Sequence, residues 1–335
     1  MLSPLTKKMK SHSVTIVRCA LVAISVFSAA VTPAASKDFP SGPVRIVVPY
    51  PAGGPSDTAA RLLTEPLSRQ LGQPVIVENR SGGAGLIGTE AALRSEHDGH
   101  TLLLGGVATF VLLPAVRPEV YNVMSDMVPL TQLWSAPQVL ALRKDLDIST
   151  ASDLVAYAKK NPGKLTFGSA GAGSITHLAI MLFEQEAGVH VIHVPYRSTA
   201  LWIADAAGNR IDGGFGDVGT LFPHVEAGAI KPVLITAPAR NRRVPNVPTA
   251  PEAGLPGVQT QNWFGLVALG KTPPDVVARL RSAIAAAQAS PDYIAALRQV
   301  GADVGQPGHQ AFGALIASDI ERFGPIMRAV TATGK

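Results

Sequence analysis

The chain has 335 residues, of which 16% are charged and one is a cysteine. A single cysteine excludes an intramolecular disulfide and a zinc site built from several thiolates. Residues 1–36 carry four basic and no acidic side chains, which leaves 25 basic and 24 acidic residues in the rest of the chain. This near balance gives no reason to expect nucleic acid or an anionic membrane surface as a partner.

The first 36 residues have the pattern of a secretory signal peptide. Four basic residues precede an uncharged apolar run from Cys19 to Val31, and small residues follow up to Ser36. This order is typical of a cleaved leader, and the run is shorter than the roughly 20 residues that a membrane-spanning helix needs. We therefore expect residues 1–36 to be removed and the mature chain to lie in the periplasm without an inserted helix.

After residue 36, short apolar runs bounded by Gly or Pro alternate with amphipathic stretches, which predicts βαβ units. The expected strands are 44–48, 74–78, 101–104, 165–167, 190–194, 213–215 and 232–235. Continuous apolar runs favour parallel strands buried on both faces. Helices are expected over 151–160 and 175–186. A helix over 58–71 should kink or stop near Glu65, because Pro66 lacks a backbone donor.

The length of about 300 residues after the leader suits two lobes better than one core. Two longer apolar stretches, 128–143 and 263–269, are interpreted as strands that cross between these lobes. Helices near 274–289, 291–300 and 309–330 would then complete the N-terminal lobe. We expect lobe 1 to comprise 37–138 with 264–335, and lobe 2 to comprise 139–263.

The first chemical signal is the loop at the end of the first strand, where VVPYPAGGPSDTAARLL spans residues 47–63. Ala52, Gly53 and Gly54 leave the backbone bare, and Asp57 or the preceding serine is a natural N-cap. Unpaired N–H groups and the helix dipole bind anions at such a position. Because no lysine follows the glycines and Asp57 would repel a phosphate, the loop predicts a carboxylate ligand.

A second loop, GSAGAGSITHLA at residues 168–179, repeats this arrangement after the strand at 165–167. Ser169 and Ser174 supply hydroxyls, and Gly171 exposes backbone. His177 is able to donate to a carboxylate, although a histidine in this setting is more often structural. One such loop in each lobe predicts that the two loops hold one ligand from opposite sides.

Two other patterns point to different chemistry and are weaker. Gly83, Gly85 and Gly88 match GxGxxG, but they follow the second strand at a distance, so we predict no nucleotide cofactor. The histidines show no zinc-ligand spacing, so we predict no metal. The GxSxG elbow is absent around Ser169. We therefore expect no catalytic residues, with a secreted serine hydrolase using Ser169 or Ser174 and His177 as the first alternative.

Seven segments carry a family resemblance: VPYPAGGPSDTAARLL, VIVENRSGGAGLIGTEAA, DGHTLLLGG, GSAGAGSITHLA, HVPYRSTA, PTAPEAGLPG and NWFGLVA. Together and in this order they resemble the Bug receptors, the periplasmic solute-binding proteins of the tripartite tricarboxylate transporter family. The resemblance implies a two-lobed α/β fold of the Venus-flytrap type, class II-like, with the ligand cleft between the lobes. It also implies a monomeric receptor that delivers a small organic acid to membrane transporter subunits or to a sensor kinase.

In this family the ligand carboxylate is held mainly by backbone N–H groups, hydroxyls and ordered water, with little use of Arg or Lys. Carried onto this chain, the resemblance implies ligand contacts from Tyr50, Ala52, Gly53, Gly54, Asp57, Thr109, Ser169, Gly171, Ser174, His177, Ser198, Thr199 and Asp217. At the last position the chain departs from the family, which commonly has Phe-Asp-Asn where this chain has Phe-Gly-Asp.

The ligand itself is expected to have an apolar middle. Phe110, Trp202 and Tyr50 would line an apolar part of the pocket, with core packing of Trp202 as the alternative. An aromatic acid or a longer dicarboxylate should then bind better than succinate. An amino-acid receptor is the second alternative, because Asp57 is able to accept a hydrogen bond from an ammonium group.

Overall fold

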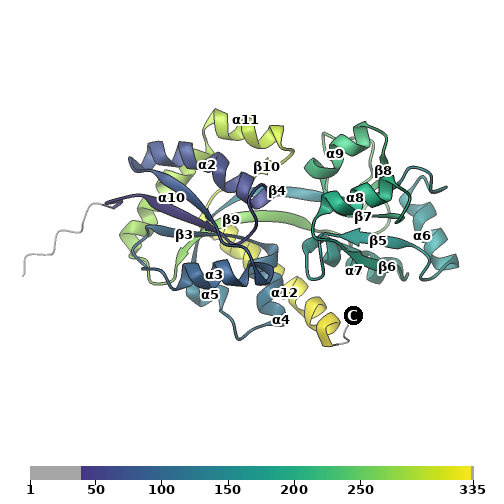
Figure 1. The fold of residues 1–335 in the computed structure, drawn as a ribbon, viewed down its shortest axis with the longest axis horizontal. Helices are drawn as coiled ribbons and strands as arrows, with labels where there is room; N and C mark the ends of the chain where they lie inside the picture. Colours follow the sequence, from purple (N-terminus) through teal and green to yellow (C-terminus); the bar gives the residue numbers. More distant parts are fainter. Residues whose placement is uncertain (1–38, 333–335) are drawn as a thin grey trace, which may run out of the picture. The chain divides into compact units, whose positions relative to one another are not determined.

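The computed structural model describes residues 39–332, with side chains described up to Ala329, so the predicted signal peptide lies outside the described residues (Figure 1). Among these residues, no helix combines the length and the apolar character that crossing a membrane requires. The strands follow one another in the order β2-β1-β3-β9-β4-β7-β5-β6, and β8 and β10 also pair with β4.

The first half of this order is built on three parallel strands. β1 (Val44–Val48) lies between β2 (Val75–Asn79) and β3 (Thr101–Gly106), and β3 pairs antiparallel with β9 (Gln261–Leu269). The core residues of β1 and β3 are almost fully buried on both faces. This burial explains why these strands read as continuous apolar runs in the sequence.

The second half contains β7 (Gly213–Asp217), β5 (Thr166–Ser169) and β6 (Ile192–Pro195), which are parallel to one another. β8 (Ile230–Ile235) and β7 both pair antiparallel with β4. β8 therefore runs in the same direction as β7, as predicted for 232–235, but the strand that it pairs with is the antiparallel β4. The terminal strands β2 and β6 are also only partly buried, because each has a neighbour on one side alone.

β4 (Met127–Arg143) joins the two halves. Its first part pairs with β9 and its last part pairs with β7 and β8, so one strand of 17 residues belongs to both. The ribbon shows β4 and β9 running between two groups of elements, which gives the two-lobed α/β arrangement (Figure 1). The residues at which one lobe ends and the other begins remain a prediction.

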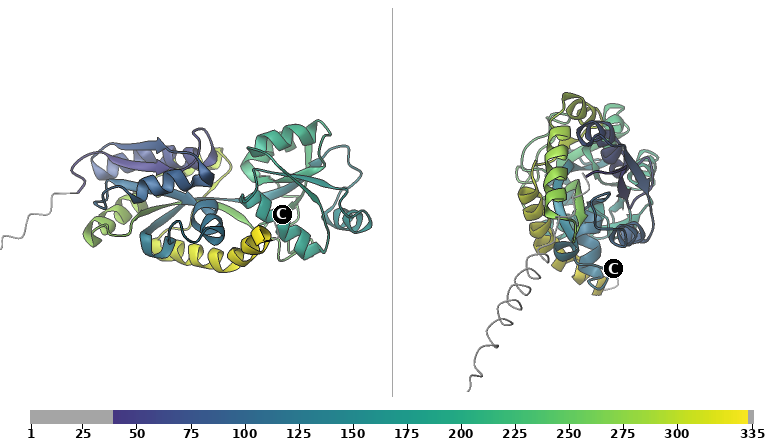
Figure 2. Two further views of the ribbon diagram at one scale, coloured as in Figure 1. Left: turned by 60° about the horizontal axis from the view of Figure 1, so that its bottom comes forward. Right: turned by 90° about the vertical axis from the view of Figure 1, so that its left-hand side faces the viewer.

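The helices cover both halves: α2 (Pro55–Leu71), η1 (Gly83–Gly85), α3 (Leu86–Leu93), η2 (Ala108–Leu112), α4 (Leu113–Val116), α5 (Val123–Asp126), α6 (Ala151–Lys160), α7 (Ile175–Ala187), α8 (Thr199–Ala207), α9 (Val218–Glu226), α10 (Pro274–Gln288), α11 (Pro291–Gln299) and α12 (His309–Ala332). α10 and α11 pack on α2, and α12 packs on β4 and α4. The C-terminal helices therefore complete the N-terminal half. The yellow helix α12 extends beyond it to line a groove with α7 (Figure 2).

Pro66 does not stop its helix. α2 continues through it to Leu71, so the expected stop near Glu65 is wrong. An internal proline removes one backbone hydrogen bond and costs about 3 kcal/mol. Pro66 itself is buried, together with Leu63 and Leu67 on the same helix. Each fully buried aliphatic side chain contributes roughly 1.5–3 kcal/mol, which offsets the lost bond.

Candidate functional site

A cleft of about 710 Å³ lies where the beginnings of α2, α7, α8 and α9 come together. Each of these helices follows a strand or its loop, and open α/β sheets bind ligands at the carboxyl ends of their strands. The lining residues from these four places are Ala52, Gly53, Gly54, Pro55, Ser56, Thr58, Ala170, Ile175, Thr176, Ser198, Thr199, Ala200, Asp217, Gly219 and Thr220. The cleft therefore collects four helix N-termini.

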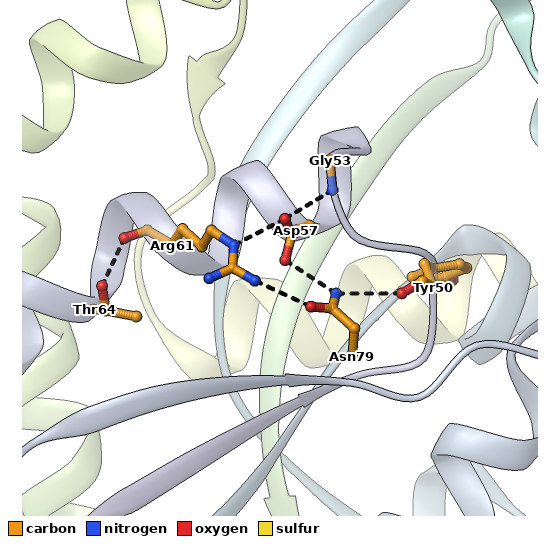
Figure 3. A network of polar contacts seen from close by, with 6 residues as sticks. All are labelled: Tyr50, Gly53, Asp57, Arg61, Thr64 and Asn79. Carbon is orange, nitrogen blue, oxygen red and sulfur yellow. Dashed lines mark hydrogen bonds and ion pairs between the residues drawn. The ribbon is translucent and has the colours of Figure 1, made fainter.

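The loop before α2 is held by the carboxylate of Asp57. Its Oδ2 accepts from the Gly53 amide and from Arg61 Nε, both at 2.9 Å, and its Oδ1 accepts from Asn79 Nδ2 at 3.0 Å (Figure 3). Asn79 Nδ2 also donates to the carbonyl oxygen of Tyr50. These hydrogen bonds lower the pKa of Asp57 and outweigh its burial, which by itself raises that pKa. Asp57 is thus an ionised structural group.

This network decides which amides of the first loop remain free. The Gly53 N–H is occupied by Asp57, so its expected contact with a ligand conflicts with the hydrogen bond that it already makes. Pro55, the first residue of α2, has no N–H, and the Thr58 amide bonds to the Gly54 carbonyl. The amides of Ala52, Gly54, Ser56 and Asp57 have no partner among the described residues. Those four donors are the ones available to an anion.

The loop before α7 uses its hydroxyls internally. Ser174 Oγ donates to the Gly171 carbonyl at 2.7 Å and accepts from the His177 amide at 3.2 Å, so it caps the helix. The Ala170 amide donates to Thr176 Oγ1 at 2.8 Å. Ser174 and Gly171, which were predicted to contact the ligand, therefore bond to each other within the loop. The helix-start amides of Ile175 and Thr176 have no partner among residues 39–332.

Two stacked histidines lie beneath this loop. The rings of His177 and His193 are 3.9 Å apart and nearly parallel. Burial, together with His193, lowers the pKa of His177 to about 4, so its ring is neutral and its Nδ1 accepts from the Gly173 amide at 3.2 Å. Ser169 is fully buried, and its Oγ lies 2.6 Å from His193 Nε2. Ser169 and His177 therefore support the loop from behind.

The beginnings of α8 and α9 present open groups to the cleft. Ser198 precedes α8, and its side chain makes no capping bond within the described part of the chain. The exposed Arg197 beside it is the one basic residue among the described lining residues, and it has no ion-pair partner there. At α9, Asp217 Oδ2 accepts from Asn262 Nδ2 at 2.8 Å, and burial raises the pKa of Asp217 to about 6. The cleft thus has a free cation and a weakly acidic carboxyl.

An aromatic wall faces these polar groups. Tyr50, Trp134 and Phe264 line the cleft, with Phe264 in ring contact with both Tyr50 at 6.0 Å and Trp134 at 5.2 Å. Thr109 does not line the cleft, but its Oγ1 accepts from the Tyr50 hydroxyl at 3.1 Å. Thr109 therefore orients an aromatic residue of this wall.

Phe110 and Trp202 do not belong to this wall. Both are fully buried in the core. Glycines make room for them: a Cβ on Gly105 would lie 2.1 Å from Phe110, and a Cβ on Gly168 would lie 2.4 Å from Trp202. The expected pocket contact of these two aromatic residues is therefore wrong, and core packing of Trp202 is the correct reading.

Of the predicted ligand contacts, those that line the cleft are Tyr50, Ala52, Gly53, Gly54, Ser198, Thr199 and Asp217, and those behind its surface are Asp57, Thr109, Ser169, Gly171, Ser174 and His177. Sequence reasoning missed Trp134 and Phe264, since apolar residues within a strand look like core. It also missed Arg197, although the HVPYRSTA segment contains it. Ligand contact by each of these residues stays a prediction.

Comparisons with known proteins identify the family of this chain. The family model described as tripartite tricarboxylate transporter family receptor matches residues 59–332. A UPF0065 protein from the tcbD-tcbE intergenic region of Pseudomonas sp. strain P51 is 35% identical over 85% of both chains. Protein BugT of Bordetella pertussis is 30% identical over 93% of this chain and 97% of its own.

Solved structures agree with this assignment. The Rhodopseudomonas palustris protein MatC with bound malate has a TM-score of 0.76 and 31% identity, covering 86% of this chain and all of its own. A second R. palustris protein, solved with adipate, has a TM-score of 0.78 and 31% identity, covering 87% of this chain and 99% of its own. The chain belongs to the receptor family of the tripartite tricarboxylate transporters.

Proposed function

We propose that this receptor captures a small carboxylate in the cleft, in the periplasm, and delivers it to a tripartite tricarboxylate-type transporter. The observation that carries the proposal is the convergence of four helix N-termini on one cavity, with unpaired amides on α2 and α7. A hydrogen bond to a charged acceptor contributes roughly 1.5–3 kcal/mol. Several such bonds supply the roughly 8 kcal/mol of a micromolar Kd.

The ligand is a dicarboxylate with an apolar middle, including aromatic diacids. Helix-start amides provide for one carboxylate, and Arg197 beside the start of α8 provides a cation for the second. The wall formed by Trp134, Phe264 and Tyr50 suits methylene groups or a ring between them. The structures that carry malate and adipate support a diacid of four to six carbons as the starting point.

We propose a receptor and not an enzyme. A serine hydrolase needs an accessible nucleophile, whereas Ser169 is fully buried and Ser174 donates its hydroxyl proton to a backbone carbonyl. The amino-acid alternative rested on Asp57, whose two oxygens already accept three hydrogen bonds. Asp217 is the only acidic residue among the described lining residues, and its Oδ2 already accepts a hydrogen bond from Asn262. A carboxylate ligand therefore fits better than an ammonium-bearing one.

The experiment is isothermal titration of the mature protein with adipate, succinate, hexanoate and alanine. We expect adipate to bind more tightly than succinate because its longer chain reaches the aromatic wall, and we expect alanine not to bind. A saturable enthalpy without consumption of adipate supports the receptor. Alanine binding above all three acids, or turnover of an ester substrate, contradicts the proposal.

Arg197→Gln tests the second carboxylate. The Kd for adipate should rise about tenfold, as expected for one exposed charge-assisted bond, whereas the Kd for the monoacid hexanoate should not change. Arg240→Gln is the matched control, because Arg240 is also exposed but pairs with Glu252 and does not line the cleft. Equal losses for adipate and hexanoate would remove Arg197 from the second-carboxylate position.

A further inference from the structure

A backbone contact lies at the edge of the cleft, between the start of α9 and the end of α11. Gly219 and Val300 both line the cavity. A Cβ on Gly219 would lie 2.4 Å from the Val300 carbonyl oxygen, and a Cβ on Gly301 would lie 2.6 Å from the Gly219 Cα. Neither position has room for a side chain, so the two segments touch through their backbones.

Arg243 stabilises the same contact. Arg243 Nη2 donates to the carbonyl oxygens of Arg298 at 2.8 Å and Gln299 at 3.1 Å, at the end of α11. Its guanidinium also lies 5.0 Å from the ring centre of Phe222 on α9. The last carbonyls of a helix carry partial negative charge and favour a cation. Arg243 therefore caps α11 while it rests on α9.

The two sides of this contact belong to different cores. Val244, which follows Arg243, packs with Trp202 and other residues around the second half of the strand order. Leu297 and Ala302, which flank the α11 side, pack with β1 and α2 in the first half. The residues of the contact lie outside β4 and β9, the strands that connect the halves. It therefore bridges the two lobes at a further point.

We propose that this contact, which we call the clasp (Gly219, Arg243 and residues 298–301), sets the lobe separation and thereby the ligand affinity. Arg243 does not line the cavity, so it acts as a positioning residue. When only a fraction of the molecules has the binding-competent arrangement, the apparent Kd rises as that fraction falls. Loss of the clasp frees the lobes to separate and lowers the competent fraction.

Arg243→Ala is the direct test, measured by small-angle X-ray scattering and by titration with adipate. We expect a larger radius of gyration without ligand, and a three- to tenfold higher Kd for adipate, in proportion to the lost competent fraction. Arg243→Lys keeps a donor for the carbonyl oxygens and should restore part of both properties. A denaturant titration of each variant confirms that the chain is folded.

Arg279→Ala is the matched control. Arg279 Nη2 donates to the Gln70 carbonyl at 2.6 Å, so it also joins one helix to the end of another, but α10 and α2 pack in the same half. We expect neither scattering nor Kd to change. Gly219→Ala, which would push against the Val300 carbonyl, should act like Arg243→Ala. Gly313→Ala, whose Cβ would meet only one atom at 3.7 Å, should not.

The clasp depends on the two-lobed fold and not on which acid binds. If adipate fails to bind the wild-type protein, the proposed ligand class is wrong and the ligand-free scattering still tests the clasp. If Arg243→Ala changes neither the radius of gyration nor any measurable Kd, the inference is overturned. It is also overturned if Arg279→Ala produces the same changes, because the effect would then be one of general stability.

Discussion

The loops before α2 and before α7 are both rich in small residues, but different hydrogen bonds hold them in place. In the first, one carboxylate from inside the helix, that of Asp57, reaches back to the Gly53 amide and also binds Arg61 and Asn79. In the second, neutral groups bond to one another, with Ser174 capping α7 above a pair of stacked neutral histidines. Small residues predict both loops, but only hydrogen-bond partners tell which amides remain for a ligand.

The difference also fixes how each loop responds to its surroundings. The first loop depends on a charge that is held by three donors and stays ionised, since its pKa is lowered. The second depends on neutral rings, since burial lowers the pKa of His177 to about 4. A substitution that removes charge should therefore affect the first loop, and acidification should affect the second.

Asp57→Ala should have the largest effect. It removes the buried carboxylate that accepts from the Gly53 amide and from Asn79, and a hydrogen bond to a charged group contributes roughly 1.5–3 kcal/mol. We expect a loss of about 2–4 kcal/mol in the free energy of unfolding, measured with urea at pH 7, and weaker binding of adipate because the first loop is no longer held.

Arg61→Ala is the control for this change. Its side chain is half exposed, and an exposed ion pair contributes about 0–1 kcal/mol. It should therefore cost less than 1 kcal/mol. An equal loss for the two variants would mean that the ion pair, and not the acceptance from Gly53 and Asn79, stabilises the first loop.

A pH series separates the second loop from the first. Because the pKa of His177 is lower in the folded state, its neutral ring stabilises the fold fully above about pH 6.5 and loses that contribution as the pH falls toward 4. Each pKa unit corresponds to about 1.4 kcal/mol. The difference in unfolding free energy between wild type and His177→Asn should therefore fall by about 2 kcal/mol between pH 7 and 4.5.

Asp217→Asn should show the opposite trend. The pKa of Asp217 is raised to about 6, so its protonated form stabilises the fold below about pH 4 and this contribution is lost as the pH rises through 6. The advantage of wild type over this variant should grow on acidification. If both variants shift in the same direction, the neutral state of one of these two groups has been misassigned.

Much of the fold was accessible from the sequence because its signals are local. Helix 151–160 is confirmed as α6, with its capping box at Thr150 and Asp153, and the crossing strand lies within one residue of 128–143. The failures involve partners that are distant in the sequence. α2 continues through Pro66 because that residue is buried in the core, and Gly168 on β5 leaves the room that Trp202 occupies.

Only part of the site could be predicted from the sequence, for the same reason. Glycine-rich turns before helices mark where amides point, and Gly54 and Ser198 do line the cleft. The partner of Ser169 is His193, 24 residues away on the next strand, and not the nearby His177. The sequence also does not show that the Asp57 carboxylate accepts a hydrogen bond from the Gly53 amide. Both outcomes depend on which side chains the folded sheet brings together.

The smallest effects are expected from two serines: Ser169, which supports the second loop, and Ser198, which lines the cleft. Ser169→Ala removes the hydroxyl that bonds to His193 and accepts from the Gly171 amide at 3.1 Å, so it should cost about 1–2 kcal/mol of unfolding free energy and change the Kd for adipate by less than twofold. Ser198→Ala should do the reverse, because Ser198 is exposed at the cleft: stability unchanged and the Kd a few-fold higher. A large loss of affinity in Ser169→Ala at full stability would mean that the second loop opens and that its buried hydroxyl reaches the ligand.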